Sequence, residues 1–237
     1  MGDSQAAFDD NKVKMTKKNS QSQDNPFENL ANRYDKWFDS PRGREIFSLE
    51  VACLQQLIGN LEGRWLEVGV GTGRFAKALG IKEGIDPAQA VLKMAADRGI
   101  KVNLARAEDI PYPAETFDGL LMVVTICFLD NPAEALRECY RILKRQGRLI
   151  IGLVPADSPW GQFYAEKGRD NHPFYSAAKF YTSQEVIKLA DKVGLTFYAA
   201  RSCLFDAPDK IGGDLSKEIH TGIAPSAGFV AMDFRKV

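Results

Sequence analysis

Apolar positions alternate between short continuous runs and helical stripes from residue 64 onward. The continuous runs predict buried strands at residues 64–70, 81–85, 100–105, 117–124 and 148–154. The stretches between them carry a helical period, a polar start and a glycine stop, which predict helices at residues 73–79, 86–99 and 131–147. Strands that alternate with helices in this way indicate parallel βαβ units wound on both faces of one sheet.

The two ends of the chain follow different patterns. Residues 1–24 are polar, lack the apolar core of a secretory signal, and are predicted to be disordered. Asn25 and Pro26 predict a helix start, with Glu28 as the returning carboxylate, and a second helix follows Gly43 up to Gly59. We therefore expect a helical cap over residues 25–60.

The C-terminal part begins with an aromatic-rich connection at residues 155–181, followed by a helix at 183–193. The last two predicted strands, 195–204 and 228–237, are joined by a Gly/Pro-rich loop too short for a crossover helix, so antiparallel pairing is expected. The fold prediction is an α/β domain over residues 25–237. Its doubly wound, seven-stranded and mostly parallel sheet has helices on both faces and an antiparallel last strand.

The amino-acid composition limits the classes of partner that are expected. The 237 residues include 31 basic and 31 acidic side chains, which disfavours a surface built to neutralise nucleic-acid phosphates and favours a small-molecule partner. The four cysteines form no C-x-x-C pair, so neither a metal site nor a disulfide framework is expected. No apolar run approaches the roughly 18 residues of a membrane helix. We expect a cytoplasmic protein with no membrane partner, as a monomer or homodimer.

The stretch Leu66–Ala76 carries the main functional signal. Gly69, Gly71 and Gly73 follow a strand and open a helix, where backbone N–H groups and the absence of Cβ atoms suit a nucleotide-like ligand. Asp86 ends the next strand and is placed to accept hydrogen bonds from both ribose hydroxyls. The same glycines also fit a loose dinucleotide fingerprint, so an NAD-dependent oxidoreductase is an alternative. However, Glu67 before the loop suits a ligand amine and would repel a pyrophosphate.

Five motifs carry a resemblance to a known family. They are Glu67–Gly73, Gly84–Pro87, Ala107–Tyr112, Thr116–Asp118 and Leu136–Leu149. Over residues 32–237 the chain resembles class I S-adenosylmethionine-dependent methyltransferases of the type 11 group, which includes ubiquinone and menaquinone biosynthesis enzymes. The resemblance implies methyl transfer from S-adenosylmethionine to a small-molecule acceptor, with S-adenosylhomocysteine as product. A non-catalytic S-adenosylmethionine-binding regulatory module is a further alternative.

The resemblance also implies roles for individual residues. Those expected to bind the cofactor are Tyr34, Glu67, Gly69, Gly71, Gly73, Asp86, Pro87, Ala107, Glu108 and Thr125. Arg106 departs from the family pattern, which often has an acid there for the adenine amino group. The aromatic connection at residues 155–181 is expected to be an insertion that covers the acceptor site, although its rings could instead simply pack onto the sheet. His172 and Tyr175 are the candidate catalytic residues, and His220 is a weaker candidate base.

Overall fold

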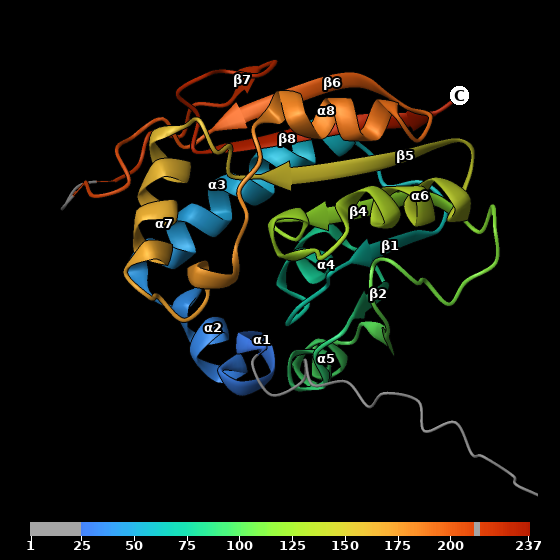
Figure 1. Ribbon diagram of the computed structural model, residues 1–237, viewed down its shortest axis with the longest axis horizontal. Helices are drawn as coiled ribbons and strands as arrows, with labels where there is room; N and C mark the ends of the chain where they lie inside the picture. Colours follow the sequence, from blue (N-terminus) through green and yellow to red (C-terminus); the bar gives the residue numbers. More distant parts are fainter. Residues whose placement is uncertain (1–24, 211–213) are drawn as a thin grey trace, which may run out of the picture.

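The computed structural model describes residues 25–210 and 214–237, so the predicted disordered tail at residues 1–24 lies outside the described residues. Within the described residues, eight strands form one sheet in the order β3-β2-β1-β4-β5-β8-β6-β7 (Figure 1). The strands are β1 (Trp65–Val68), β2 (Glu83–Asp86), β3 (Lys101–Leu104), β4 (Phe117–Val123), β5 (Leu143–Leu153), β6 (Leu195–Cys203), β7 (His220–Thr221) and β8 (Phe229–Lys236).

Strand directions confirm the predicted sheet. Pairings from β3 through β5 are parallel, whereas β8 lies between β5 and β6 and is antiparallel to both. The expected number of strands was seven, and the eighth is the two-residue strand β7, which pairs with Arg201 and Ser202 at the edge. A strand this short has no apolar pattern of its own, so periodicity could not predict it.

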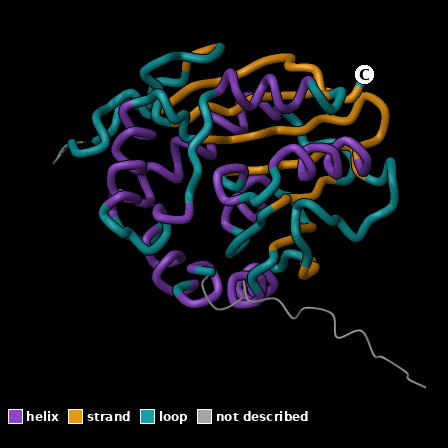
Figure 2. Tube along the Cα trace, viewed as in Figure 1, coloured by secondary structure: helices purple, strands orange, loops and turns teal. Residues whose placement is uncertain are grey.

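Helices cover both faces of the sheet (Figure 2). They are α1 (Pro26–Asn29), α2 (Ala31–Trp37), α3 (Pro41–Ile58), α4 (Arg74–Leu79), α5 (Gln89–Asp97), α6 (Pro132–Ile142), α7 (Pro159–Arg169) and α8 (Ser183–Asp191), with 3₁₀ turns η1 (Ile126–Phe128) and η2 (Tyr175–Ala177). One apolar core joins α6 and α8 to the strands, and a second joins α3, α4 and α5 to the opposite face. This doubly wound layering is the one predicted.

Several local predictions were wrong. The first predicted helix is two helices, and Glu28 bonds to the Ala90 N–H at 3.2 Å instead of returning to its own cap. The helix predicted at residues 131–147 ends at Ile142 rather than Gly147, because residues from Leu143 onward pair with β4 as the start of β5. Asp86 is not the helix cap, since α5 begins at Gln89 after Ala88.

The aromatic connection at residues 155–181 contains a helix, α7, that was not predicted. Its start is capped by Ser158, whose side chain accepts a hydrogen bond from the Gly161 N–H, and Pro159 occupies the first turn. Among residues 25–210 and 214–237, no helix is both long and apolar enough to cross a membrane.

One buried ion-pair cluster fixes the N-terminal helices to the sheet layer. Asp35 of α2 is only 7% exposed and binds the guanidinium of Arg74 on α4, with an Nε–Oδ1 distance of 2.8 Å. Arg98, just after α5, contacts the same carboxylate at 2.8 Å and also donates to the Thr72 carbonyl. We call Asp35, Arg74 and Arg98 the cap junction; it holds α2 over the glycine loop.

Candidate functional site

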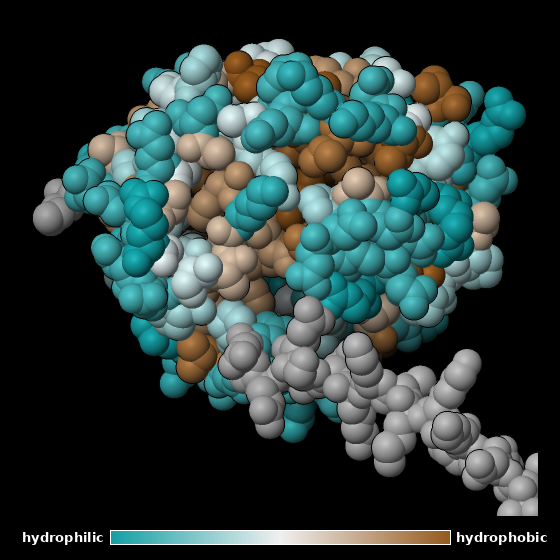
Figure 3. Space-filling model, in the orientation of Figure 1, coloured by the Kyte–Doolittle hydropathy of each residue, from teal (hydrophilic) through white to brown (hydrophobic). Residues whose placement is uncertain are grey.

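A cavity of about 1390 Å³ opens at the carboxyl ends of β1, β2 and β4, beneath α1, α2 and α7. Ligands of doubly wound sheets bind at this edge. Figure 3 shows apolar side chains lining a hollow between the α7 side and the α6 side of the molecule. The volume exceeds the roughly 300–1,000 Å³ usual for one small ligand, so a cofactor and an acceptor fit together.

The three glycines of the loop have different roles. Gly71 has a φ of 50°, lines the cavity, and has only the Tyr34 ring within 4 Å of an added Cβ. Gly69 also lines the cavity, but its Cβ would lie 2.3 Å from the Thr125 side chain. Gly73 is not a cavity residue: its Cβ would meet Ala95 of α5 at 3.0 Å. The absence of a Cβ at Gly73 therefore allows close packing of the loop against α5, and its role at the ligand stays a prediction.

Glu67 is a buried carboxylate at the end of β1, with 2% of its surface exposed. One side of the carboxyl accepts a backbone hydrogen bond from Ala76, and Oε2 has no hydrogen-bond partner among the described residues. Burial, with a smaller contribution from the charge of Asp86, raises the pKa of Glu67 above its usual range. Glu67 lies behind the cavity surface and does not itself line it. An orphaned buried oxygen is costly, so it favours a donor group at this place.

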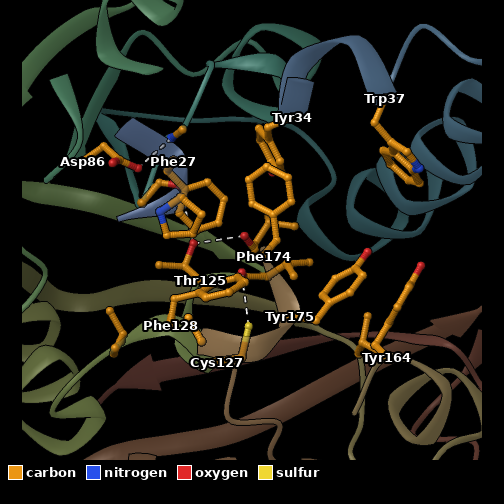
Figure 4. A pocket seen from close by; sticks show the side chains of 18 of the residues that line it. Phe27, Tyr34, Trp37, Asp86, Thr125, Cys127, Phe128, Tyr164, Phe174 and Tyr175 are labelled. Carbon is orange, nitrogen blue, oxygen red and sulfur yellow. Dashed lines mark hydrogen bonds between the residues drawn. The ribbon is translucent and has the colours of Figure 1, made fainter. Parts of the chain in front are cut away.

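Asp86 lies at the end of β2 on the other side of the glycine loop, and it lines the cavity (Figure 4). Its Oδ2 accepts from the Gly71 N–H at 3.0 Å and its Oδ1 from the Ala88 N–H at 2.9 Å. Burial nevertheless raises the pKa of Asp86 to about 6, against the effect of those two hydrogen bonds. Each carboxylate oxygen has a second lone pair, so Asp86 can still accept two hydrogen bonds from a ligand.

The far end of the cavity contains the other expected adenine-side residues. Pro87, Ala107 and Glu108 all line it. Arg106 forms ion pairs with Glu108 at 3.4 Å and Asp130 at 2.6 Å. The Glu108 carboxylate also accepts from the Asn131 N–H at 3.2 Å. Arg106, where the family pattern often has an acid, therefore holds Glu108 in place at the rim.

Thr125 reaches the cavity through an unusual turn at the end of β4. Val124, a β-branched residue, has a φ of 48°, in the left-handed region that such residues rarely adopt. The Thr125 hydroxyl then bonds to the Val123 carbonyl at 3.0 Å and lies 3.4 Å from the Gly69 carbonyl. Strained backbone of this kind collects at functional sites, where it aims a side chain.

Four rings from separate elements close one side of the cavity. Phe27 of α1 contacts Tyr34, Phe128 and Phe174 with ring-centroid distances of 5.3, 5.0 and 5.5 Å. These rings converge in Figure 4 next to Thr125. Tyr34 was predicted here, whereas Phe27 and Phe128 were not, because single aromatic residues in short helical segments resemble ordinary core positions.

The candidate catalytic residues lie beside this group of rings, with the His172 ring centroid 6.1 Å from that of Phe174. His172 stacks on Tyr175 with ring centroids 4.4 Å apart, and both line the cavity. Burial, with charges from Lys167 and Arg33, lowers the pKa of His172. His220 is elsewhere: it is exposed on β7, 3.2 Å from Glu218, and does not line the cavity. The weaker prediction that His220 is a base is therefore not supported.

Most of the aromatic connection forms a wall of the cavity, as predicted. The lining residues from it include Trp160, Phe163, Tyr164, His172, Phe174, Tyr175 and Phe180. Tyr181 is instead part of the core beneath α6 and α8. Sequence analysis missed Glu50 of α3 and Cys127 of η1, which also line the cavity.

Comparisons with known proteins agree with this geometry. A family model described as "Methyltransferase domain" matches residues 66–151. The uncharacterized protein Rv2003c of Mycobacterium tuberculosis is 41% identical over 202 residues, which cover 85% of this chain and 70% of that protein. The uncharacterized protein MJ1123 of Methanocaldococcus jannaschii is 38% identical over 213 residues, covering 90% of this chain and 100% of the relative.

A crystal structure from Thermotoga maritima is also similar. It is a SAM-dependent methyltransferase, named as a possible histamine N-methyltransferase, with a TM-score of 0.81 and 36% sequence identity. The similarity covers 89% of this chain and 98% of that one. A relative this similar over nearly its full length, together with the matched domain and the sheet order, establishes that the chain belongs to the S-adenosylmethionine-dependent methyltransferases and uses S-adenosylmethionine as its cofactor.

Proposed function

We propose that the cavity binds S-adenosylmethionine across the carboxyl ends of β1 and β2 and transfers its methyl group to a small molecule bound beside α3 and α7. The observation that carries this proposal is the pair of buried carboxylates on either side of the glycine loop. Glu67 has an orphaned oxygen and Asp86 has spare acceptor capacity, and neither makes an ion pair within the described residues. The cofactor offers an amine and two ribose hydroxyls as donors.

The remaining cavity residues fit the same cofactor. Gly71 leaves open space where its backbone faces Tyr34, which suits close approach of a ligand. Glu67 would bind the amino-acid end directly or through water, Asp86 the ribose, and Pro87, Ala107 and Glu108 the adenine. Thr125 would lie near the amino-acid carboxylate and the methyl group. When bound, the cofactor supplies a methyl group already activated by its sulfonium.

The protein's part in the reaction is to align the acceptor and exclude water. Positioning of two reactants can supply several kcal/mol of barrier lowering, so a dedicated catalytic residue is not obligatory. The rings of Phe27, Tyr34, Phe128 and Phe174 close the cavity on one side, and their faces tolerate a cationic group. His172 and Tyr175 line the cavity next to Phe174 and could orient the acceptor.

A small molecule fits this site better than a macromolecule, because the cavity lies under three helices and its lining includes many apolar side chains. The equal numbers of acidic and basic residues also favour a small acceptor over a nucleic acid. A cytoplasmic location and a monomer or homodimer remain predictions from composition.

Calorimetric titration with S-adenosylhomocysteine tests the proposed site. We expect saturable binding at one site per chain, weakened by Asp86→Ala and unaffected by Asp97→Ala, a change at an exposed aspartate on α5. Equal affinity in a folded Asp86→Ala variant would contradict the assignment.

A further inference from the structure

Glu50 is a buried acid in the acceptor part of the cavity. Arg42, Ile46 and Glu50 are spaced four residues apart on α3, and this face of the helix lines the cavity. Glu50 is only 7% exposed, and its carboxyl has no hydrogen bond or ion pair with another described residue. Arg42, on the same face of the helix, pairs through Nη1 with Glu45 at 3.3 Å, and its Nη2 is buried without a hydrogen-bond partner among the described residues.

Tyrosines from three other elements surround this acid. The charge of Glu50 raises the pKa of Tyr34 on α2, Tyr164 on α7 and Tyr175 in η2, in addition to burial. Tyr164 and Tyr175 have ring centroids 4.5 Å apart with their planes tilted by 33°, and Figure 4 shows both hydroxyls pointing the same way. Phe180 stacks behind Tyr164 at 6.4 Å. The acid therefore lies in an aromatic-walled pocket.

The pocket combines two features that bind cations. An unpaired buried carboxylate is strongly destabilised, and its partner of choice is a positive charge that also donates hydrogen bonds. Aromatic faces attract cations through their negative π surface, most strongly where water is excluded. A neutral hydroxyl would instead meet Glu50 in its protonated form, because burial raises the pKa of this acid to about 8 and no ion pair with another described residue offsets that rise. A bound cation supplies the positive charge that favours the ionised form.

We propose that Glu50 and the walls made by Tyr34, Tyr164 and Tyr175 form the acceptor site, and that the acceptor is a primary or secondary amine that arrives as an ammonium ion. This inference rests on the proposed function, since the acceptor must lie beside the methyl group of the bound cofactor.

The same carboxylate has a proton-transfer role. An ammonium nitrogen has no lone pair and cannot attack a methyl group. Transfer of one proton breaks an N–H bond, forms an O–H bond on Glu50, and leaves a neutral amine beside a neutral acid. The nitrogen lone pair can then form the new N–C bond while the electron pair of the breaking S–C bond goes to sulfur. A base with a pKa near the working pH suits this transfer.

Isothermal titration with a matched pair of probes tests the proposal. The full chain is first saturated with S-adenosylhomocysteine and then titrated with 2-phenylethylamine or 2-phenylethanol, which differ in one cationic group. We expect the amine to bind roughly tenfold or more tightly than the alcohol, the range for a charged hydrogen-bond partner. Glu50→Gln should remove this preference, and Glu166→Gln, at an exposed glutamate on α7, should preserve it.

Proton release gives a second measurement that needs no variant. Because Glu50 is mostly protonated at pH 7 before binding, formation of the amine complex should release about one proton, seen as a dependence of the heat on the buffer's ionisation enthalpy. The other groups that face Glu50 are Tyr34, Tyr164, Tyr175 and Cys203, and all have raised pKa values, so none ionises at pH 7. His172, stacked on Tyr175, has a lowered pKa. The alcohol should release none.

The outcomes separate the two proposals. If S-adenosylhomocysteine does not bind to the wild-type chain, the proposed cofactor site is wrong. If it binds and the amine shows neither a preference over the alcohol nor proton release, the cofactor site stands and the amine site is overturned. The same conclusion follows if neither probe binds, or if Glu50→Gln retains cofactor binding and the full amine preference.

Discussion

The cap junction and the cavity both contain buried acids, but within the described chain the acid in the cap junction is paired with cations and the buried acids in the cavity are not. Asp35 is surrounded by Arg74 and Arg98, and although burial opposes ionisation, hydrogen bonds from Arg74, Thr72 and Arg98 lower its pKa to about 2. Glu50 has the same exposed fraction as Asp35 but forms no ion pair with another described residue, and burial raises its pKa to about 8. Asp86 behaves in the same way as Glu50, because burial raises its pKa to about 6.

The contrast distinguishes structural acids from ligand-binding acids. A paired buried acid joins elements of the fold, because removing either partner leaves an uncompensated charge. An unpaired buried acid destabilises the empty protein, so its presence indicates a partner that comes from outside. By this criterion the cap junction holds α2 in place, whereas Glu50, Glu67 and Asp86 form the positions where ligand donors are expected.

The largest expected effect is on stability at the cap junction. Asp35→Ala leaves two arginines without their partner in a partly buried site, and we expect a loss of about 2–4 kcal/mol in the free energy of unfolding. Urea denaturation measures it. Asp39→Ala removes an exposed partner of the same Arg74 and should cost no more than about 0.5 kcal/mol. Similar losses of unfolding free energy in Asp35→Ala and Asp39→Ala would show that the buried ion pairs of Asp35 stabilise the fold no more than the exposed one of Asp39.

The next effect is on cofactor affinity. Asp86→Ala removes a charged hydrogen-bond acceptor from the ribose position, so binding of S-adenosylhomocysteine should weaken by about 1–3 kcal/mol. Asp86 also accepts two backbone N–H groups, so unfolding should be measured in parallel to separate loss of the loop from loss of the ligand contact. A loss of stability with unchanged affinity would show that Asp86 stabilises the glycine loop and does not bind the ligand.

The pH dependence of the unfolding free energy, measured without ligand, should also distinguish the paired acid from the unpaired ones. Groups with a raised pKa bind more protons in the folded state, so their contribution lowers stability as the pH rises above the unfolded value. For Glu50 this window runs from its ordinary 4.5 to about 8, and for Asp86 from 3.8 to about 6. Asp35 has a lowered pKa, and its stabilising contribution is lost only as the pH falls from about 4 toward 2.

Denaturation at pH 5.5 and pH 7.5 checks this prediction. The unfolding free energy of the wild-type chain should fall by on the order of 2–3 kcal/mol between these values, and Glu50→Gln should lose much of the slope. His172, with its lowered pKa, acts weakly in the opposite direction. A wild-type stability that rises over this range, or an unchanged slope in Glu50→Gln, would show that Glu50 is not the unpaired group we describe.

The smallest expected effect concerns the aromatic ring of Tyr34, which lines the cavity next to Gly71. Tyr34→Ala should weaken binding of S-adenosylhomocysteine by about 0.5–1.5 kcal/mol, the usual value of an aromatic contact, because the ring faces Gly71 across the cavity. Tyr34→Phe keeps the ring and should bind as the wild-type chain does. If both substitutions weaken binding equally, the hydroxyl rather than the ring face is the contact.

Much of the fold could be predicted because its central strands are short apolar runs bounded by glycine or polar residues. Patterns of this kind do not show where a helix gives way directly to a strand, so the start of β5 at Leu143 was missed. The helix α7 was hidden by glycines and aromatic residues, although Ser158 and Pro159 are an ordinary start signal. The oxidoreductase and non-catalytic alternatives were resolved only by the similarity to known methyltransferases.

The part of the candidate site around the glycine loop was the most predictable from the sequence. Asp86, Gly69, Gly71 and Tyr34 lie at the cavity as expected, and Glu67 lies just behind its surface. The packing of Gly73 against α5 was not predictable, because spacing cannot show which way a glycine faces. Glu50 was overlooked because an acid in an amphipathic helix is usually solvated. Only the packing of α3 against β6 and β8 shows that it is buried.

A crystal structure of the chain with S-adenosylhomocysteine tests the central claim most directly. We expect both ribose hydroxyls within hydrogen-bond distance of the Asp86 carboxylate and the amino group of the ligand directed toward Glu67, directly or through one water. A nucleoside bound away from the loop between β1 and α4, or a ribose with no contact to Asp86, would contradict the account.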